Sequence, residues 1–346
     1  MLAPVSRSPS VGPRLHRLAP GLALAVLLGV AATAAGTAWP LLGAPVLAVV
    51  AGVLISPLTA RRREQLEPGI GIARGPLLQV AVVLLGAPLS LHQVARVGLS
   101  SLPVMLGTLV FCLLLAWLVG RAMHIGRDLR TLIGVGTAIC GASAIAAVTP
   151  TIRAKNPDTT YAISTIFLLN VVAVLVFPPI GHALGLSQEA FGLFAGTAVN
   201  DTSSVVAAAA SYGSAAAEHA VVVKLVRTLM IIPIVIGLSV LVRRRDRAEG
   251  GPGGDGTARS LLGLVPWFLI GFLVVVAANS IGVIPQNSQG LIRQAAVFLI
   301  ATALAAIGLS TDIATLRRTG PRPLLLGLVL WAGVTSSSLI LIWLTL

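Results

Sequence analysis

Long apolar runs separated by short polar or charged segments dominate the chain. They lie at about residues 20–36, 43–58, 72–90, 102–120, 130–152, 158–181, 188–210, 219–242, 260–279, 290–310 and 322–345. A helix needs roughly 20 apolar residues to cross a bilayer. The runs do not have the short, alternating pattern of barrel strands. The pattern therefore predicts an all-α, polytopic membrane protein with about 11 transmembrane helices.

The composition agrees with a membrane protein and excludes several other classes. Hydrophobic residues make up 56% of the 346 residues and charged residues 10%, whereas soluble domains carry about 25% charged residues. The net charge of +13 does not indicate a nucleic-acid partner, because the basic residues form short clusters between apolar runs. Both cysteines, Cys112 and Cys140, lie inside predicted spans. We therefore expect no disulfide framework, no metal site and no cofactor.

The basic clusters predict the topology. With the N-terminus in the cytoplasm, the inner segments hold 17 lysine and arginine residues and the outer segments hold 4. Cytoplasmic loops of membrane proteins are enriched in these residues. We expect a cytoplasmic N-terminus and an external C-terminus.

Two polar stretches indicate segments that lie outside the membrane. Residues 1–17 are rich in Pro, Ser and Arg, which predicts a disordered cytoplasmic N-terminus, followed by an extra first transmembrane helix over 18–40. The alternative, a secretory signal peptide, fits less well because the run is long enough to span the bilayer. The segment 243–259, rich in Gly, Asp and Arg, predicts a flexible cytoplasmic loop.

Short motifs recur at an offset near 150 residues. Examples are Ala51-Gly52 against Ala195-Gly196, and Arg74 against Arg227. Five predicted helices separate the equivalents, so the repeat would be inverted in the membrane. We predict five-helix repeats over 41–185 and 186–346. A local echo, GTAICGAS at 136–143 and GTAVNDTS at 196–203, is interpreted as convergent use of small and hydroxyl residues.

The stretch GTAVNDTSSVV places polar groups inside an apolar run. Asp201 is deeply placed, and an ionisable residue in the membrane usually faces a cavity or a partner. One interpretation is a helix interruption that lines a substrate cavity with Asn200, Thr202, Ser203 and Ser204. The other is that Asp201 caps a helix beginning at Thr202.

A second polar stretch lies in the fifth run. Gly136 and Gly141 stand among small polar side chains, of which Thr137, Cys140 and Ser143 are candidate ligands. An unwound segment here would present backbone N–H groups and a helix dipole to an anion. Close helix packing through small residues is the alternative.

Basic residues within the spans are the third candidate feature. Lys224 and Arg227 share one helix face at i and i+3. They could pair with Asp201, hold an anionic substrate, or extend to the membrane surface. Three more polar residues are additional candidates with structural alternatives: Arg74 and Arg293 as interface anchors, and Asn170 as a helix-to-helix hydrogen bond.

Enzyme motifs are absent from the sequence. It contains no HExxH, Walker A or GxSxG pattern. We therefore expect a protein that is not an enzyme.

Several blocks carry a family resemblance: GVGTAICGASAIAAVTPTI (134–152), FAGTAVNDTSSVVAAAASYG (194–213), KLVRTLMIIPI (224–234) and AAIGLSTDIATLRRTGPRPLLLG (305–327). From about residue 40 onward the chain resembles the bacterial sulfate exporter family of YeiH-type inner-membrane proteins, within the cation:proton antiporter and bile-acid transporter superfamily. The resemblance implies an extra first helix, two inverted five-helix repeats and two crossing, interrupted helices. By position these would be spans 5 and 10.

Residues and resemblance together predict a secondary transporter that exports a small oxyanion, sulfate or a related sulfur oxyanion, by alternating access. Asp201 would couple transport to H⁺ or Na⁺. One alternative is a cation/proton antiporter in which Asp201 binds the cation. Another is a membrane receptor or partner-binding subunit. The oligomeric state is left open, a homodimer included.

Overall fold

Helices form all the regular structure of the described residues in the computed structural model, which are 12–38, 43–248, 266–310 and 321–345. Within the described residues, each of the predicted apolar runs is largely helical, although several divide into consecutive helices. Within these residues, six helices are long and apolar enough to cross a membrane. The elements are α1 (Gly12–Ala38), α2 (Gly43–Thr59), η1 (Ala60–Arg62), α3 (Arg63–Ile72), η2 (Ala73–Leu77), α4 (Leu78–Leu84), α5 (Leu91–Ala122), α6 (Arg127–Ala138), α7 (Ala142–Ile152), α8 (Asn156–Ala183), α9 (Gln188–Ala198), α10 (Thr202–Tyr212), α11 (Ser214–Leu229), α12 (Ile231–Ala248), α13 (Trp267–Ser280), α14 (Gln286–Ser310) and α16 (Pro321–Thr345).

The chain divides into two compact units. The small unit comprises Met1–Gln79 and Phe298–Thr311, and the large unit comprises Val80–Val297 and Asp312–Leu346. This division does not follow the predicted repeats, because each unit takes residues from both halves of the sequence. The inverted repeats remain a prediction.

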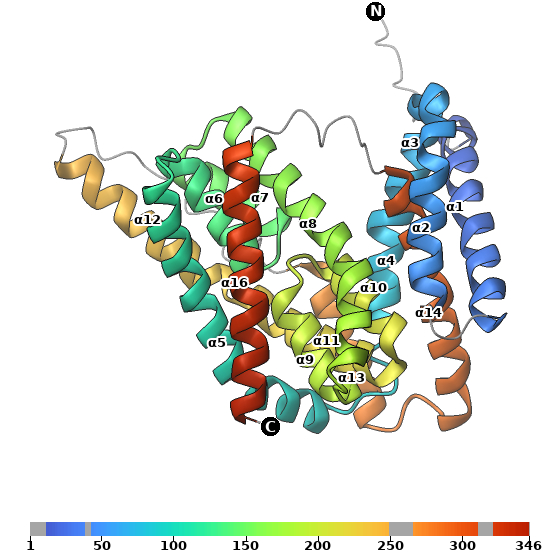
Figure 1. Cartoon of the computed structure of the whole chain (residues 1–346). Coiled ribbons are helices and arrows are strands. Elements are labelled where there is room, and N and C mark those ends of the chain that lie inside the picture. Colours follow the sequence, from blue (N-terminus) through green and yellow to red (C-terminus); the bar gives the residue numbers. More distant parts are fainter. Residues whose placement is uncertain (1–11, 39–42, 249–265, 311–320, 346) are drawn as a thin grey trace, which may run out of the picture. The chain divides into compact units, whose positions relative to one another are not determined.

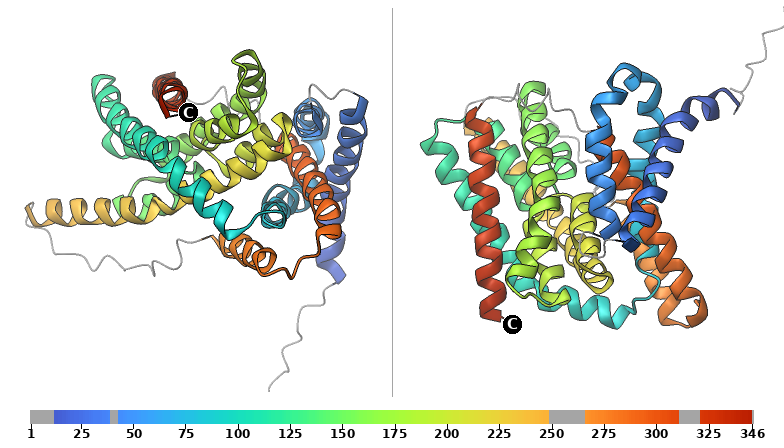
Figure 2. Two further views of the ribbon diagram at one scale, coloured as in Figure 1. Left: turned by 90° about the horizontal axis from the view of Figure 1, so that it is seen from below. Right: turned by 45° about the vertical axis from the view of Figure 1, so that its right-hand side comes forward.

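Close helix contacts hold the small unit together. Helix α1 packs against α2 and α3 (Figure 2). The last turns of α14 approach α2 so closely that a Cβ at Gly308 would lie 2.5 Å from the carbonyl oxygen of Val49. The Ser56 hydroxyl donates to the Leu309 carbonyl at 3.1 Å, and Arg63 donates to the Ser310 carbonyl at 2.9 Å. Small residues thus permit packing in which side chains satisfy the final carbonyls of α14.

The large unit contains α5 to α13 and α16, with α16 running alongside α5 (Figure 1). Helices α9 and α11 pack together over much of their length. Glycines on α9 allow this, since a Cβ at Gly192 would lie 2.8 Å from the Ala216 carbonyl oxygen and one at Gly196 would lie 3.1 Å from that of Ala220. The α9 and α11 backbones are therefore closely apposed.

Two of the apolar runs are interrupted helices. The fifth run divides into α6 and α7, as the glycines predicted, and the seventh divides into α9 and α10. The expectation that span 10 is the second interrupted helix is wrong, because α14 is continuous from Gln286 to Ser310. Its glycines do not unwind it: Gly308 makes the close contact with α2, and Gly290 has open space around it.

Two segments that composition assigned to flexible chain are partly helical. Helix α1 begins at Gly12, so it includes part of the predicted N-terminal tail, and α12 continues to Ala248, into the predicted loop 243–259. Residues 1–11 and 249–265 lie outside the described residues.

Candidate functional site

The two helix interruptions have the same length and spacing but different backbone conformations, since Ile139 has φ −120° and ψ −90° where Val199 has φ −86° and ψ 134°. We call Ile139–Gly141, between α6 and α7, break 1, and Val199–Asp201, between α9 and α10, break 2. In both, the first helix ends at an alanine, three residues intervene, and the next helix begins. The echo between 136–143 and 196–203 therefore marks a three-residue break that occurs twice, which the convergent interpretation missed.

The breaks lie against each other in the large unit. Gly141 has φ +66°, a conformation that favours glycine, and a Cβ there would lie 3.1 Å from the Cβ of Asp201. The two interrupted helices therefore contact each other at the positions where their helical backbone hydrogen bonds stop.

Lys224 of α11 joins the two breaks. Its side chain is fully buried, and Nζ donates to the carbonyl oxygens of Ile139 and Val199, both at 2.8 Å. Each of these carbonyls belongs to the first residue of a break, where no helical N–H is available to it. One ammonium thus satisfies equivalent carbonyls in both breaks.

Arg227, one turn later on α11, repeats this arrangement. It is also fully buried; Nε donates to the Ala138 carbonyl at 2.6 Å, and Nη1 donates to the Thr197 carbonyl. Cations are favourable at helix C-termini because the dipole is negative there. Lys224 and Arg227 therefore cap the C-terminal ends of both α6 and α9.

This geometry decides among the expectations for the two bases. Extension to the membrane surface is wrong, because both side chains are fully buried. Lys224 donates to the Val199 carbonyl, two residues before Asp201, so this base and Asp201 meet at the same break. Within the described residues, however, Asp201 forms no ion pair with either base.

The Asp201 carboxylate caps α10. Its Oδ1 accepts from the backbone N–H of Ser203 at 2.7 Å and of Ser204 at 3.3 Å, and the Ser204 hydroxyl donates to Oδ2. Thr202 is the first residue of α10, and both it and Ser203 are half-buried. The capping interpretation of Asp201 is confirmed, and its acceptor atoms are engaged within its own chain segment.

The N-terminus of α7 differs, because no side chain caps it. Gly141 occupies the cap position and makes no side-chain hydrogen bond. Ala142 and Ser143, the first two residues of α7, are exposed. Their N–H groups are free of helical partners, as in the first turn of any helix.

Other polar candidates in the breaks have different surroundings. The Thr137 hydroxyl donates within α6 to the Ile133 carbonyl at 2.9 Å, which leaves its ligand role without geometric support. Cys140 is buried beside Thr228 of α11, a residue that the sequence interpretation missed. Thr228 lies four residues after Lys224 on the same helix, and this spacing could have identified it.

Asn170 and Asn200 connect α8 to break 2. The Asn170 side-chain oxygen accepts from the backbone N–H of Asn200 at 3.1 Å, so Asn170 makes the predicted helix-to-helix type of bond. Asn200 is fully buried, and neither atom of its own side-chain amide has a partner among the described residues.

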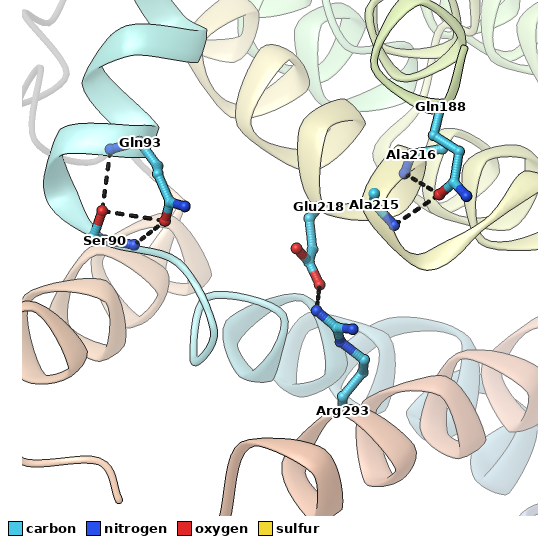
Figure 3. A network of polar contacts seen from close by, with 7 residues as sticks. All are labelled: Ser90, Gln93, Gln188, Ala215, Ala216, Glu218 and Arg293. Atoms are coloured by element: carbon cyan, nitrogen blue, oxygen red, sulfur yellow. Dashed lines mark hydrogen bonds and ion pairs between the residues drawn. The ribbon is translucent and has the colours of Figure 1, made fainter. Parts of the chain in front are cut away.

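Arg293 and Arg74 are engaged elsewhere. Arg293 of α14 pairs with Glu218 of α11 at 2.5 Å (Figure 3). Close by, the Gln188 side chain accepts from the N–H groups of Ala215 and Ala216 at the start of α11. Arg74 pairs with Glu67 at 2.9 Å within the small unit, and both side chains are exposed. The structure does not bring either arginine into the breaks.

The charges at the breaks do not balance. Lys224 and Arg227 contribute two formal positive charges and Asp201 one negative charge. The breaks also present two helix C-termini and two helix N-termini, whose partial charges oppose one another. One positive charge is in excess at this point.

Comparison with known proteins identifies the family. Residues 20–327 match the family described as conserved hypothetical protein 698. The chain is 40% identical to the UPF0324 membrane protein SpyM3_0740 of Streptococcus pyogenes serotype M3, over 93% of this chain and 96% of that protein. It is 38% identical to the UPF0324 membrane protein SAG1125 of Streptococcus agalactiae serotype V (92% and 95%) and 41% identical to a UPF0324 membrane protein of Streptococcus mutans serotype c (92% and 95%). No solved structure matches. The chain belongs to this family of membrane proteins.

Proposed function

We propose that the protein is a secondary transporter of a small inorganic oxyanion, sulfate or a related sulfur oxyanion, which it exports across the bacterial inner membrane by alternating access. The observation that carries the proposal is the bridging of two broken helices by two fully buried bases. Charges inside a membrane protein are costly unless they are paired or line a functional path. The excess positive charge at the breaks suits an anionic substrate.

In this proposal the anionic substrate binds at the exposed N-terminus of α7. Lys224 and Arg227 each donate to two backbone carbonyls, so they set the potential and hold the breaks together. The free N–H groups at Ala142 and Ser143 supply hydrogen bonds for the anion, as helix N-termini do in phosphate and sulfate sites. Asp201 lies against Gly141, so its carboxylate repels an anion there. Binding of H⁺ or Na⁺ at Asp201 would remove this repulsion and couple the two fluxes.

Cation/proton antiport through Asp201 has less support. A cation bound as the substrate at the breaks, without an anion beside it, would face the two buried bases Lys224 and Arg227. Break carbonyls that could ligate a metal ion accept hydrogen bonds from the two bases.

Uptake by proteoliposomes of purified protein tests the proposal. Labelled sulfate is supplied, with sulfite, thiosulfate, phosphate or chloride as competitors, under imposed pH or Na⁺ gradients. We expect saturable uptake that sulfur oxyanions inhibit and that Lys224→Ala abolishes. Lys155→Ala, at an exposed lysine at the start of α8, is the matched control and should transport normally. Proton movement on addition of Na⁺ or K⁺ without anion flux would establish the antiport alternative instead.

A further inference from the structure

Two partly unused polar groups lie at break 2. Among the described residues, the side-chain amide of Asn200 and Nη2 of Arg227 are buried without a hydrogen-bond partner. Both residues are fully buried. Leaving such a group unpaired costs more stability than a typical hydrogen bond contributes. A membrane protein that keeps an amide and a guanidinium donor here has a use for them.

The other unpartnered polar atoms differ in their setting. They are the Thr165 and Thr302 hydroxyls and the Trp331 ring nitrogen. Thr302 packs against Gly29 in the small unit, and Trp331 stacks on Phe177 with ring centroids 5.2 Å apart. By contrast, Asn200 lies within break 2, and Arg227 donates to the carbonyl of Thr197 just before it.

The backbone contacts bring these two groups to the same segment. Arg227 donates through Nη1 to the Thr197 carbonyl, and Asn200 follows Thr197 by three residues. Asn170 fixes the position of Asn200 by accepting from its backbone N–H. These bonds hold both residues in place without using the Asn200 amide or Nη2.

The equivalent position in break 1 shows that an amide is not required to build a break. Cys140 stands there, buried against Thr228 and the start of α7. The chain therefore forms one three-residue break with a weakly polar side chain at its middle position and another, of different backbone conformation, with an amide there. The amide at break 2 adds hydrogen-bonding capacity that the local fold does not use.

We propose that Asn200 and Nη2 of Arg227 form an oxygen-recognising subsite that selects oxyanions over halides. The proposal rests on the proposed function and deepens it by naming the groups that discriminate among anions. Nδ2 and Nη2 each carry two N–H donors on planar groups, which match an anion with several oxygens better than a spherical ion. The Asn200 side-chain oxygen can also accept a hydrogen bond from the O–H group of a partly protonated oxyanion, so it favours such anions.

Thermal unfolding of the full chain in detergent tests the subsite without relying on transport. Sulfate, sulfite and thiosulfate are compared with chloride at equal ionic strength. We expect the oxyanions, but not chloride, to raise the wild-type unfolding midpoint in a saturable manner. Asn200→Leu, an apolar change of similar size, should unfold without anion at or above the wild-type midpoint. Its apparent dissociation constant for the oxyanion should rise at least roughly tenfold.

Asn156→Leu, the same change at an exposed asparagine at the start of α8, is the matched control and should keep the oxyanion response. The subsite is refuted if Asn200→Leu retains that response, or if it unfolds well below the wild type without anion, which would make the amide structural. A wild type that no oxyanion stabilises refutes it as well. If Asn200→Leu leaves uptake unchanged, the subsite is refuted but the proposed transport function is not. An Asn200-dependent midpoint shift without uptake keeps the subsite and overturns transport.

Discussion

Break 1 and break 2 are built alike but end differently. Both begin with a residue whose carbonyl accepts from Lys224, and both follow a helix that ends at an alanine. Break 1 closes with Gly141 at positive φ and leaves the start of α7 without a side-chain cap. Break 2 closes with Asp201, whose carboxylate caps α10.

This difference assigns separate roles to the ends of the four half-helices. The C-termini of α6 and α9 are held by the same two bases, so the breaks are fixed to each other through α11. The α10 N-terminus has an internal anion in Asp201, whereas the α7 N-terminus has none and is exposed. In the proposed function an external anion would therefore bind at break 1, beside the acid whose charge would control its entry.

Removing the shared base should affect both breaks at once. Lys224→Met takes away two buried hydrogen bonds of a charged donor, and we expect the free energy of unfolding to fall by about 3 kcal/mol or more. Lys155→Met, at an exposed lysine, should change it little. Denaturant unfolding in mixed micelles measures both. A loss for Lys224→Met no larger than for Lys155→Met would show that the bridge does not hold the breaks together.

A substitution at Gly141 should disturb break 1 and its contact with break 2. Gly141→Ala combines an unfavourable φ with a Cβ 3.1 Å from that of Asp201, and we expect a destabilisation of about 2 kcal/mol. Gly185 has a similar φ of +63° but open space around it, so Gly185→Ala should cost only about 1 kcal/mol. Equal losses in thermal unfolding would mean that the contact between the breaks contributes nothing.

Asp201 variants should separate capping from coupling. Asp201→Ala removes the acceptor and should cost about 1 kcal/mol, whereas Asp201→Asn keeps a capping oxygen and should cost less. If Asp201 couples the fluxes, Asn at this position should remove the dependence of sulfate uptake on the imposed pH or Na⁺ gradient. Gradient-driven uptake that persists in Asp201→Asn would limit this residue to its capping role.

Much of the helical arrangement could be predicted from the sequence, because apolar length is a strong signal in membrane proteins. The run of glycines and small polar residues near Gly141 correctly predicted an interrupted helix, and the sequence around Asp201 suggested a cap. The break expected in span 10 followed from the family resemblance and not from its own residues, and the structure does not have it. Glycine serves both for unwinding and for close packing, and Gly308 does the latter. Sequence alone does not distinguish these uses.

The partners of the two bases could not be predicted for a different reason. Lys224 and Arg227 stood out as charges in an apolar helix, but a search for partners among side chains leads to Asp201. Their acceptors are backbone carbonyls, which every residue carries and which become available only where a helix stops. Only the fold shows that both stops lie against the same face of α11.

The sign of the potential at the breaks tests the central claim most directly, and a thiol at position 143 reports it. Ser143 is exposed at the start of α7, and Ser143→Cys in a Cys112→Ser, Cys140→Ser background places the sole thiol there. Its rate of reaction is measured with a sulfonate-bearing and a trimethylammonium-bearing methanethiosulfonate, each normalised to the rate with a free thiol. We expect the anionic reagent to react roughly tenfold faster or more, and Lys224→Gln to reduce this preference. Equal rates, or a preference for the cationic reagent, would contradict an anion site at the breaks.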